Sequence, residues 1–159
     1  MRVSTVRFGE LRISEDKLIR MQKPILGFEQ LSVYVLVQQD EFQPFHWLQS
    51  VEDPAIAFAV VNPAVLFPGY RIEVHSKEVE ELMIGDPDQV ETYVVVTIPD
   101  DPLQMTANLQ GPILVNTENH LAKQLVLINS VYEPAHRIVD ALKKTEIVAE
   151  RAPEELVGV

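Results

Sequence analysis

Four histidines and several adjacent pairs of acids are the residues of this sequence that could do chemistry. His75 and Glu78 stand three residues apart, so on a helix they would share one face and could contribute two ligands to a metal ion. A zinc site needs three or four ligands, and the sequence places no third ligand near this pair. The other histidines, His46, His120 and His136, stand alone at ligand spacing. We therefore expect no metal site.

The paired acids do not suggest catalysis either. Glu52-Asp53, Glu80-Glu81 and Asp100-Asp101 are immediate neighbours, and adjacent side chains point apart on a strand or a helix, so they favour solvated turns over a working dyad. The chain has no cysteine, which excludes a thiol nucleophile and a disulfide framework. It has six glycines and no glycine-rich phosphate loop. We expect a protein that is not an enzyme and that needs no cofactor.

Acidic residues are concentrated in one part of the chain. The net charge is −11, and residues 73–101 hold nine acids but a single base, Lys77. Such a field repels nucleic acid and would steer a basic protein toward it. The alternative is that these acids only keep a helix face and its loops soluble. The acids that would form the patch are Glu78, Glu80, Glu81, Asp100 and Asp101.

The remaining pattern predicts a mainly β, single-domain, antiparallel β-barrel-like fold. Short apolar runs that end at Pro or Gly are typical of small barrels and sandwiches. They predict strands at 2–8, 17–21, 32–38, 45–51, 55–61, 71–74, 91–98, 112–116 and 121–128. Asp-Pro or Asn-Pro occurs four times, and in each the carboxylate or amide can accept a backbone hydrogen bond within a turn.

Two helices are expected. One is a short internal helix over 78–83 with Ser76 as its N-cap, and the other is a C-terminal helix that begins near Pro134. We therefore divide the chain into a β-barrel-like domain, 1–132, and a C-terminal helical extension, 133–159. No apolar run reaches the roughly 20 residues that span a bilayer, and the first fifteen residues do not resemble a signal peptide. We expect a cytoplasmic protein without a membrane partner.

Apolar residues that fall outside the strand pattern are the stronger candidates for function. Leu66, Phe67 and Pro68 follow Asn62-Pro63, and Met105 follows Pro102 closely. An exposed apolar group beside negative charge is typical of a protein interface. The alternative is that both groups fold back and cover the core of the barrel.

The same residues carry a resemblance to the FliW family of flagellar assembly factors. The order W-L-Q-S, D-P, A-F, N-P, F-P and Y within 47–70 is followed by P-x-D-P, M-T-A-N-L and P-I-x-V-N within 99–116. Phe8-Gly9-Glu10 and Gly27-Phe28-Glu29 add to the similarity, which extends to about Asn129.

The resemblance implies a small β-barrel-like protein, expected to be monomeric, that binds flagellin and also CsrA, a basic RNA-binding repressor of flagellin translation. The factor would be freed when flagellin is secreted and would then occupy the repressor. The contact residues that we expect on this basis are Leu66, Phe67, Pro68, Ile98, Pro99, Met105, Thr106 and Asn108. The alternative function is a small-ligand-binding β-barrel, which would need an apolar cavity with a few converging polar groups.

Overall fold

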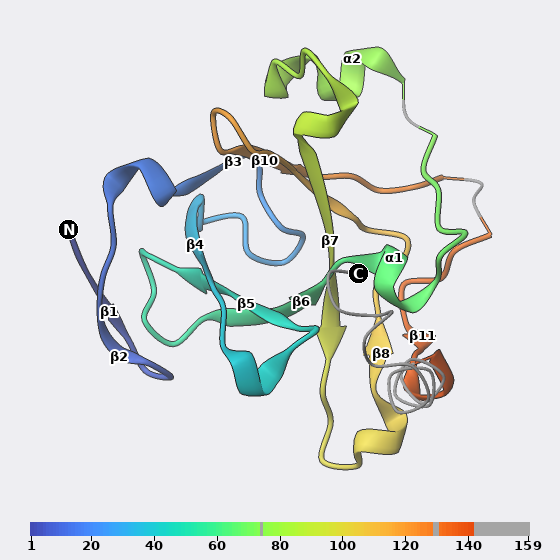
Figure 1. Cartoon of the computed structure of the whole chain (residues 1–159), viewed down its shortest axis with the longest axis horizontal. Coiled ribbons are helices and arrows are strands. Elements are labelled where there is room, and N and C mark those ends of the chain that lie inside the picture. Colours follow the sequence, from blue (N-terminus) through green and yellow to red (C-terminus); the bar gives the residue numbers. More distant parts are fainter. Residues whose placement is uncertain (74, 129–130, 142–159) are drawn as a thin grey trace, which may run out of the picture.

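Seven strands close into a barrel in the computed structural model, which describes residues 1–73, 75–128 and 131–141 (Figure 1). Each strand pairs with the next in the order β7-β6-β5-β4-β3-β10-β9, and β9 pairs back onto β7. The barrel strands are β3 (Ile19–Lys23), β4 (Val33–Val37), β5 (His46–Ser50), β6 (Ala57–Val61), β7 (Val90–Thr97), β9 (Ile113–Asn116) and β10 (Leu121–Gln124). The mainly β fold that the sequence predicts is confirmed.

The expectation of a wholly antiparallel barrel is wrong at one pair. β10 runs parallel to β3, with Leu121 opposite Arg20 and Ala122 opposite Met21, whereas the other barrel pairs are antiparallel. A closed ring with an odd number of strands cannot alternate direction throughout, so one parallel pair is required. The predicted pairing of β10 with β9 through the turn at residues 117–120 is confirmed.

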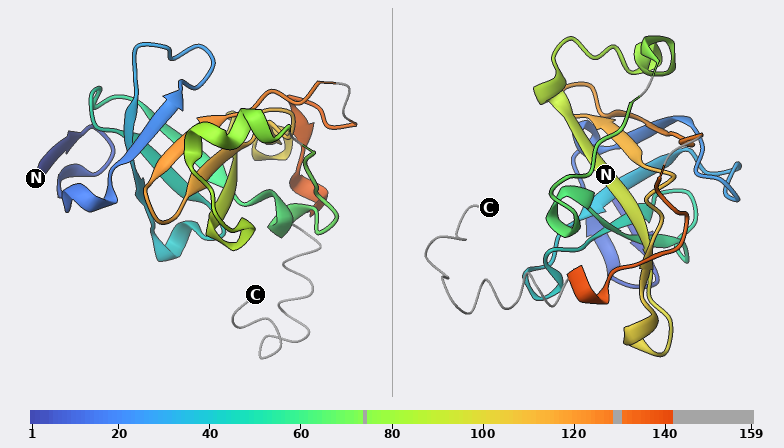
Figure 2. Two further views of the ribbon diagram at one scale, coloured as in Figure 1. Left: turned by 90° about the horizontal axis from the view of Figure 1, so that it is seen from above. Right: turned by 90° about the vertical axis from the view of Figure 1, so that its right-hand side faces the viewer.

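Shorter elements lie around the barrel (Figures 1 and 2). β1 (Arg2–Thr5) and β2 (Gly9–Arg12) form a separate hairpin, while β8 (Thr106–Ala107) pairs with β7 and β11 (His136–Arg137) pairs with β8. The helical pieces are α1 (Pro63–Leu66), α2 (Ser76–Val79), η1 (Glu15–Lys17), η2 (Asp40–Phe42), η3 (Glu80–Leu82), η4 (Pro87–Gln89) and η5 (Pro102–Gln104).

Alternation along the strands divides the apolar residues into an interior core and two outer clusters. The interior core includes Tyr34, Leu48, Val60, Tyr93 and Ile113, all nearly or fully buried. One outer cluster lies on β5, β6 and β7 and includes Trp47, Ala59, Val94, Leu66 and Ile138. The other lies on β9 and the chain after β10, and comprises Leu82, Leu114, Leu125 and Leu127. Because both faces of these strands are covered, their apolar runs are more continuous than simple alternation.

The four Asx-Pro turns behave as the sequence predicts. The side-chain oxygen of Asp53, Asn62, Asp86 or Asp101 accepts a 3.0 Å hydrogen bond from the backbone N–H two residues later in each case. At Asn62, Asp86 and Asp101 the following proline begins a short helix, because its fixed φ suits a first helical turn. The helix α1, which the sequence analysis did not anticipate, begins in this way.

Three expectations about local structure are wrong. The predicted strand at 71–74 is not formed in its described part, 71–73, where the backbone N–H of Arg71 donates to the Tyr132 hydroxyl at 2.8 Å. The internal helix is divided into α2 and η3, since Met83 adopts a left-handed conformation (φ 52°) and ends it. Ser76 is the first residue of α2, and the N-cap is His75, whose side chain makes no capping bond.

The region after Pro134 also differs from the prediction, because its first residues form a strand. His136 and Arg137 pair with Thr106 and Ala107, and Ile138 is fully buried in the outer cluster on β5–β7. Residues up to 138 therefore pack against the outside of the barrel. Helical residues begin at 139, and most of the predicted C-terminal extension, 142–159, lies outside the described residues.

Polar side chains from β9, β10 and the turn between them hold the acidic segment α2–η3 against the barrel. Lys123 is 3% exposed, and its ammonium donates to the backbone oxygen of Glu78 and to Glu81 Oε1 at 3.2 Å. Asn116 Nδ2 donates to the backbone oxygen of Leu82 at 2.8 Å, and Asn119 Nδ2 donates to the same oxygen at 3.0 Å. Leu82 is fully buried between them. A buried cation and two side-chain amides thus donate hydrogen bonds to the backbone oxygens at the end of this segment.

We predict that Lys123→Ala lowers the free energy of unfolding by about 1–3 kcal/mol, because it removes the buried ammonium that donates to the backbone oxygen of Glu78 and to the exposed carboxylate of Glu81. Amide hydrogen exchange of residues 79–82 should accelerate more than that of β5. Lys77→Ala, on the exposed face of α2, is the control and should change stability by less than about 0.5 kcal/mol. Equal effects of the two substitutions would show that Lys123 does not anchor the segment.

We also predict that Leu66→Ala costs about 2–5 kcal/mol of stability, because Leu66 is 5% exposed and fills the outer cluster. Val65→Ala, one residue earlier on α1 and 38% exposed, should cost less than about 1 kcal/mol. Chemical denaturation measures both. Unchanged stability in Leu66→Ala would mean that this side chain is free to serve an interface.

Candidate functional site

A groove opens on the surface beside β6 and β7. The two strands pair at Ala59–Val96, Val60–Val95 and Val61–Val94, and this pairing ends at Val96, although β7 continues to Thr97. The resulting hollow is about 530 Å³. It is lined by Arg7, Ile25, Leu26, Phe28, Trp47, Ala57, Phe58, Ala59, Val95, Val96, Thr97, Ile98, Asn108, Gln124 and Pro134. We call it the β6–β7 groove.

Two of the residues singled out in the sequence line this groove. Ile98 is 43% exposed at its rim, and Asn108 is half-buried, with a backbone N–H that donates to Val95 at 2.9 Å. The side-chain oxygen Oδ1 of Asn108 is buried without a hydrogen-bond partner in the part of the chain that the structure describes. Pro99 follows Ile98 directly and is half-buried. These residues give the groove an apolar rim with one amide.

The other apolar candidates surround β8 and do not line the groove. Met105 and Phe67 are half-buried against the outer cluster on β5–β7, and Thr106 pairs with Arg137 on β11. The ring of Phe67 meets that of His136 edge-on at 4.9 Å, and Pro68 is exposed next to it. Leu66 is buried, so its assignment to an exposed surface is wrong: α1 turns this side chain onto β7.

Sequence reasoning missed two parts of the groove. The guanidinium of Arg7 lies 3.9 Å from the ring centroid of Trp47, so the β1–β2 hairpin contributes a cation to one wall. Leu26, in the β3–β4 loop, is 64% exposed and contributes an aliphatic side chain to the lining. No sequence signal could have found these residues, because only the packing of the hairpin and the loop brings them to β6.

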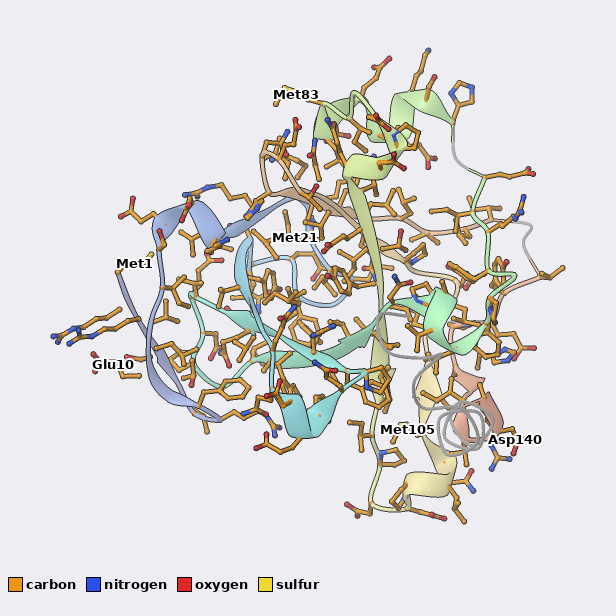
Figure 3. The ribbon with its side chains drawn as sticks, viewed as in Figure 1. Met1, Glu10, Met21, Met83, Met105 and Asp140 are labelled. Atoms are coloured by element: carbon orange, nitrogen blue, oxygen red, sulfur yellow. The ribbon has the colours of Figure 1, made fainter. Side chains whose placement is uncertain are left out.

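The acidic residues do not form a single patch. Glu78, Glu80 and Glu81 lie on α2 and η3 at one end of β7, and Asp100 and Asp101 precede η5 at the other end (Figure 1). Met83 and Met105 mark the same two ends in Figure 3. Because β7 has eight extended residues, the two groups stand roughly 25 Å apart. At physiological salt, charges so far apart act separately on a partner.

Titratable groups at the mouth of the barrel are arranged for structure. The Tyr93 hydroxyl donates to Glu91 Oε2 at 2.6 Å, and burial, followed by this hydrogen bond, raises the pKa of Tyr93. The ring of His46 meets that of Tyr93 at 6.1 Å, and burial lowers the pKa of His46, so this imidazole is neutral at pH 7. None of these groups faces a nucleophilic Ser or Thr in the contacts that the structure describes.

The barrel interior bears on the small-ligand alternative. The interior core fills the space between the strands, and hollows such as the β6–β7 groove open on the surface. Another hollow, of about 480 Å³, is lined in part by Arg12, Lys17, Glu91 and His120. Among the described residues, no three His, Asp or Glu side chains gather as metal ligands. The arrangement is suited to docking a macromolecule at the surface more than to enclosing a metabolite.

The helices within the described ranges are all too short or too polar to cross a bilayer.

Comparison with known proteins identifies relatives of nearly the same length. Residues 2–138 match the family model described as FliW protein. A flagellar assembly factor FliW from Alkaliphilus metalliredigens is 38% identical over 147 residues, which cover 92% of this chain and 91% of that protein. The one from Geobacter sulfurreducens is 39% identical over 151 residues, which cover 95% and 94%.

A solved structure agrees with the fold. A crystal structure of the flagellar assembly factor FliW superposes with a TM-score of 0.81 at 36% identity, over 87% of this chain and 96% of that one. The matched region includes β11 and Ile138, which the resemblance seen in the sequence did not reach. This chain belongs to the FliW family.

Proposed function

We propose that this protein is a flagellar assembly factor that works in the cytoplasm, as a monomer, by binding other proteins and not by catalysis. The observation that carries the proposal is identity of 38–39% over more than nine-tenths of the chain to proteins that are flagellar assembly factors. The surface supports it, since the described residues offer an apolar groove and acidic groups.

The partners in this proposal are flagellin and a CsrA-type repressor. Flagellin holds the factor until it is secreted, and the freed factor then occupies the repressor, so that translation of flagellin follows its export. The groove and the residues around β8 supply the contacts, which are apolar at Phe67, Pro68, Ile98, Pro99 and Met105 and polar at Thr106 and Asn108. The acids attract a basic repressor and repel its messenger RNA.

The direct test uses the purified protein with purified flagellin and CsrA-type repressor from the same bacterium. Calorimetry should detect binding of each partner, and addition of flagellin should release the repressor and restore its binding to RNA. If the protein binds neither flagellin nor the repressor, the proposal is overturned. Binding of flagellin alone would remove the regulatory half and leave a role in flagellin handling.

For the groove, we predict that Ile98→Arg weakens partner binding at least about tenfold, because it places a charge at a desolvated apolar contact. Ile98 is 43% exposed, so the melting temperature should fall by only a few degrees. Val6→Arg on the β1–β2 turn, 76% exposed and outside the groove lining, adds the same charge as a control. If Ile98→Arg and Val6→Arg bind the partner with equal affinity, the groove is not part of the interface.

For the acidic groups, we predict that Glu78→Lys combined with Glu80→Lys lowers affinity for a basic partner about three- to tenfold at low salt. Most of the difference should disappear at high salt. Both side chains are exposed and are not ion-paired in the described residues. Glu81 is unsuitable for this test, because reversing its charge would place a cation beside the buried Lys123.

The comparison is Asp100→Lys combined with Asp101→Asn, at the far end of β7, which adds three positive charges against four for the first pair and keeps a side-chain oxygen at 101 for the Leu103 N–H. If only the first pair of substitutions lowers the affinity, the electrostatic contact is at α2–η3. If only the second pair lowers it, the contact is at η5. If neither pair changes the affinity or its salt dependence, the electrostatic part of the proposal is wrong.

A further inference from the structure

The backbone hydrogen bonding between β10 and the chain around β9 continues beyond Gln124, the last residue of β10. The backbone N–H of Leu125 donates to Pro112 and that of Leu127 donates to Gln110, each at 2.8 Å, which extends the antiparallel pairing of β10 with β9. Side chains alternate accordingly. Leu125 and Leu127 are buried in the outer cluster beneath α2 and η3, whereas Val126 and Ile128 point to the other side.

The opposite edge of this extension is open. β3 pairs with β10 only as far as Lys23, and the chain then turns away at Pro24. In a strand, the N–H groups of Val126 and Ile128 point away from the 110–112 side, and within residues 1–73, 75–128 and 131–141 neither N–H has a hydrogen-bond partner. The edge therefore offers backbone groups that a further strand could pair with.

A hollow lies where a continued β3 would run. It is about 290 Å³ and is lined by Lys23, Pro24, Leu26, Glu29, Glu78, Lys123, Gln124, Leu125 and Val126. Val126 is 50% exposed, Ile128 is 80% exposed and Leu26 is 64% exposed. Natural proteins shield such edges with charge, proline or a covering element, and an open edge bearing aliphatic side chains is typical of a strand-addition site.

The charges around the edge indicate what kind of strand it accepts. Glu29, Glu73 and Glu78 are exposed and line this hollow or the adjoining one, against Lys23 and Arg71, and the exposed Glu80 follows α2 at the start of η3. The ammonium of Lys123 is already paired with Glu81. The local field is therefore acidic, as is that of the whole protein, with a net charge of −11. A second copy of this chain would bring like charge to the edge, so a basic partner is favoured.

We propose that residues 125–128 form a strand-addition site for an extended, basic segment of a partner protein. Its backbone pairs with Val126 and Ile128, its alternate aliphatic side chains contact Val126, Ile128 and Leu26, and its basic residues face Glu78 and Glu29. The hollow shares Leu26 and Gln124 with the β6–β7 groove, but Ile98 and Asn108 line only the groove and Val126 does not line it, so substitutions at these positions distinguish the two contacts.

The test is solution NMR on the full chain with two short synthetic peptides. In one peptide valine alternates with lysine, and in the other valine alternates with glutamate. The basic peptide should shift the amide signals of Val126 and Ile128 and slow their hydrogen exchange at least about tenfold at saturation. The acidic peptide should do neither.

Three variants locate the effect. Val126→Pro removes an N–H that has no partner in the described residues and blocks the edge, while Leu125 and Leu127 keep their bonds to Pro112 and Gln110. It should abolish binding of the basic peptide, whereas Val126→Thr, which keeps the N–H, should bind within about threefold of the parent. If Val126→Pro fails to fold, Ile128→Lys replaces it as the test variant. Its lysine, at an exposed position, repels the basic peptide and should weaken binding.

Other outcomes overturn the proposal. Equal binding of both peptides, undiminished binding by Val126→Pro or Ile128→Lys, or shifts confined to residues away from 125–128 would each exclude a basic strand at this edge. Sedimentation that shows self-association lost in Val126→Pro would assign the edge to a second copy instead.

Discussion

Strand β7 is the element on which the rest of the structure depends, because one of its edges pairs with two different strands, β9 and β8. Its first half pairs with β9 and closes the barrel, and its second half pairs with β8, which in turn holds β11. A strand edge can pair only once at each residue. The change of partner near Val95 therefore forces residues 98–108 out of the barrel wall. Ile98 follows the half of β7 that pairs with β8, and Asn108 follows β8, so two lining residues of the β6–β7 groove come from this part of the chain.

Closure on part of β7 also explains why the apolar residues are distributed over three clusters. The barrel interior is filled by its own side chains, and the outer faces of β5–β7 and β9–β10 must then be covered by something else. Helix α1, β11 and Ile138 cover the first, and Leu82 with its helical segment covers the second. Buried apolar surface of this kind supplies most of the driving force for folding. The surface elements are thus parts of the core and cannot be removed as appendages.

The sequence predicted the strands and the turns because both depend on local patterns. The β-branched runs at 33–37 and 90–97 and all four Asx-Pro turns are where the residues indicate. Strand order, the parallel β3–β10 pair and the burial of Leu66 depend on contacts between distant residues, which no local pattern encodes. The division of the acids into two groups could have been predicted, since the expected strand at 91–98 lies between them and is too long to bring them together.

Lys123 connects the electrostatics of the surface to the core. An acidic segment on a protein of charge −11 is repelled by the remainder of the molecule, and burying a lone ammonium would itself be costly. The ion pair with Glu81 and the bond to the Glu78 backbone offset both costs at once, and Asn116 and Asn119 fix the end of η3. The acids on α2 and η3 are consequently held in one orientation over the chain that follows β10. Charges fixed in this way attract a partner without first having to be ordered, which is the condition for fast and selective association. The same contacts bury Leu125 and Leu127 and turn Val126 and Ile128 outward, so one buried cation positions both the acidic groups and the open strand edge beside them.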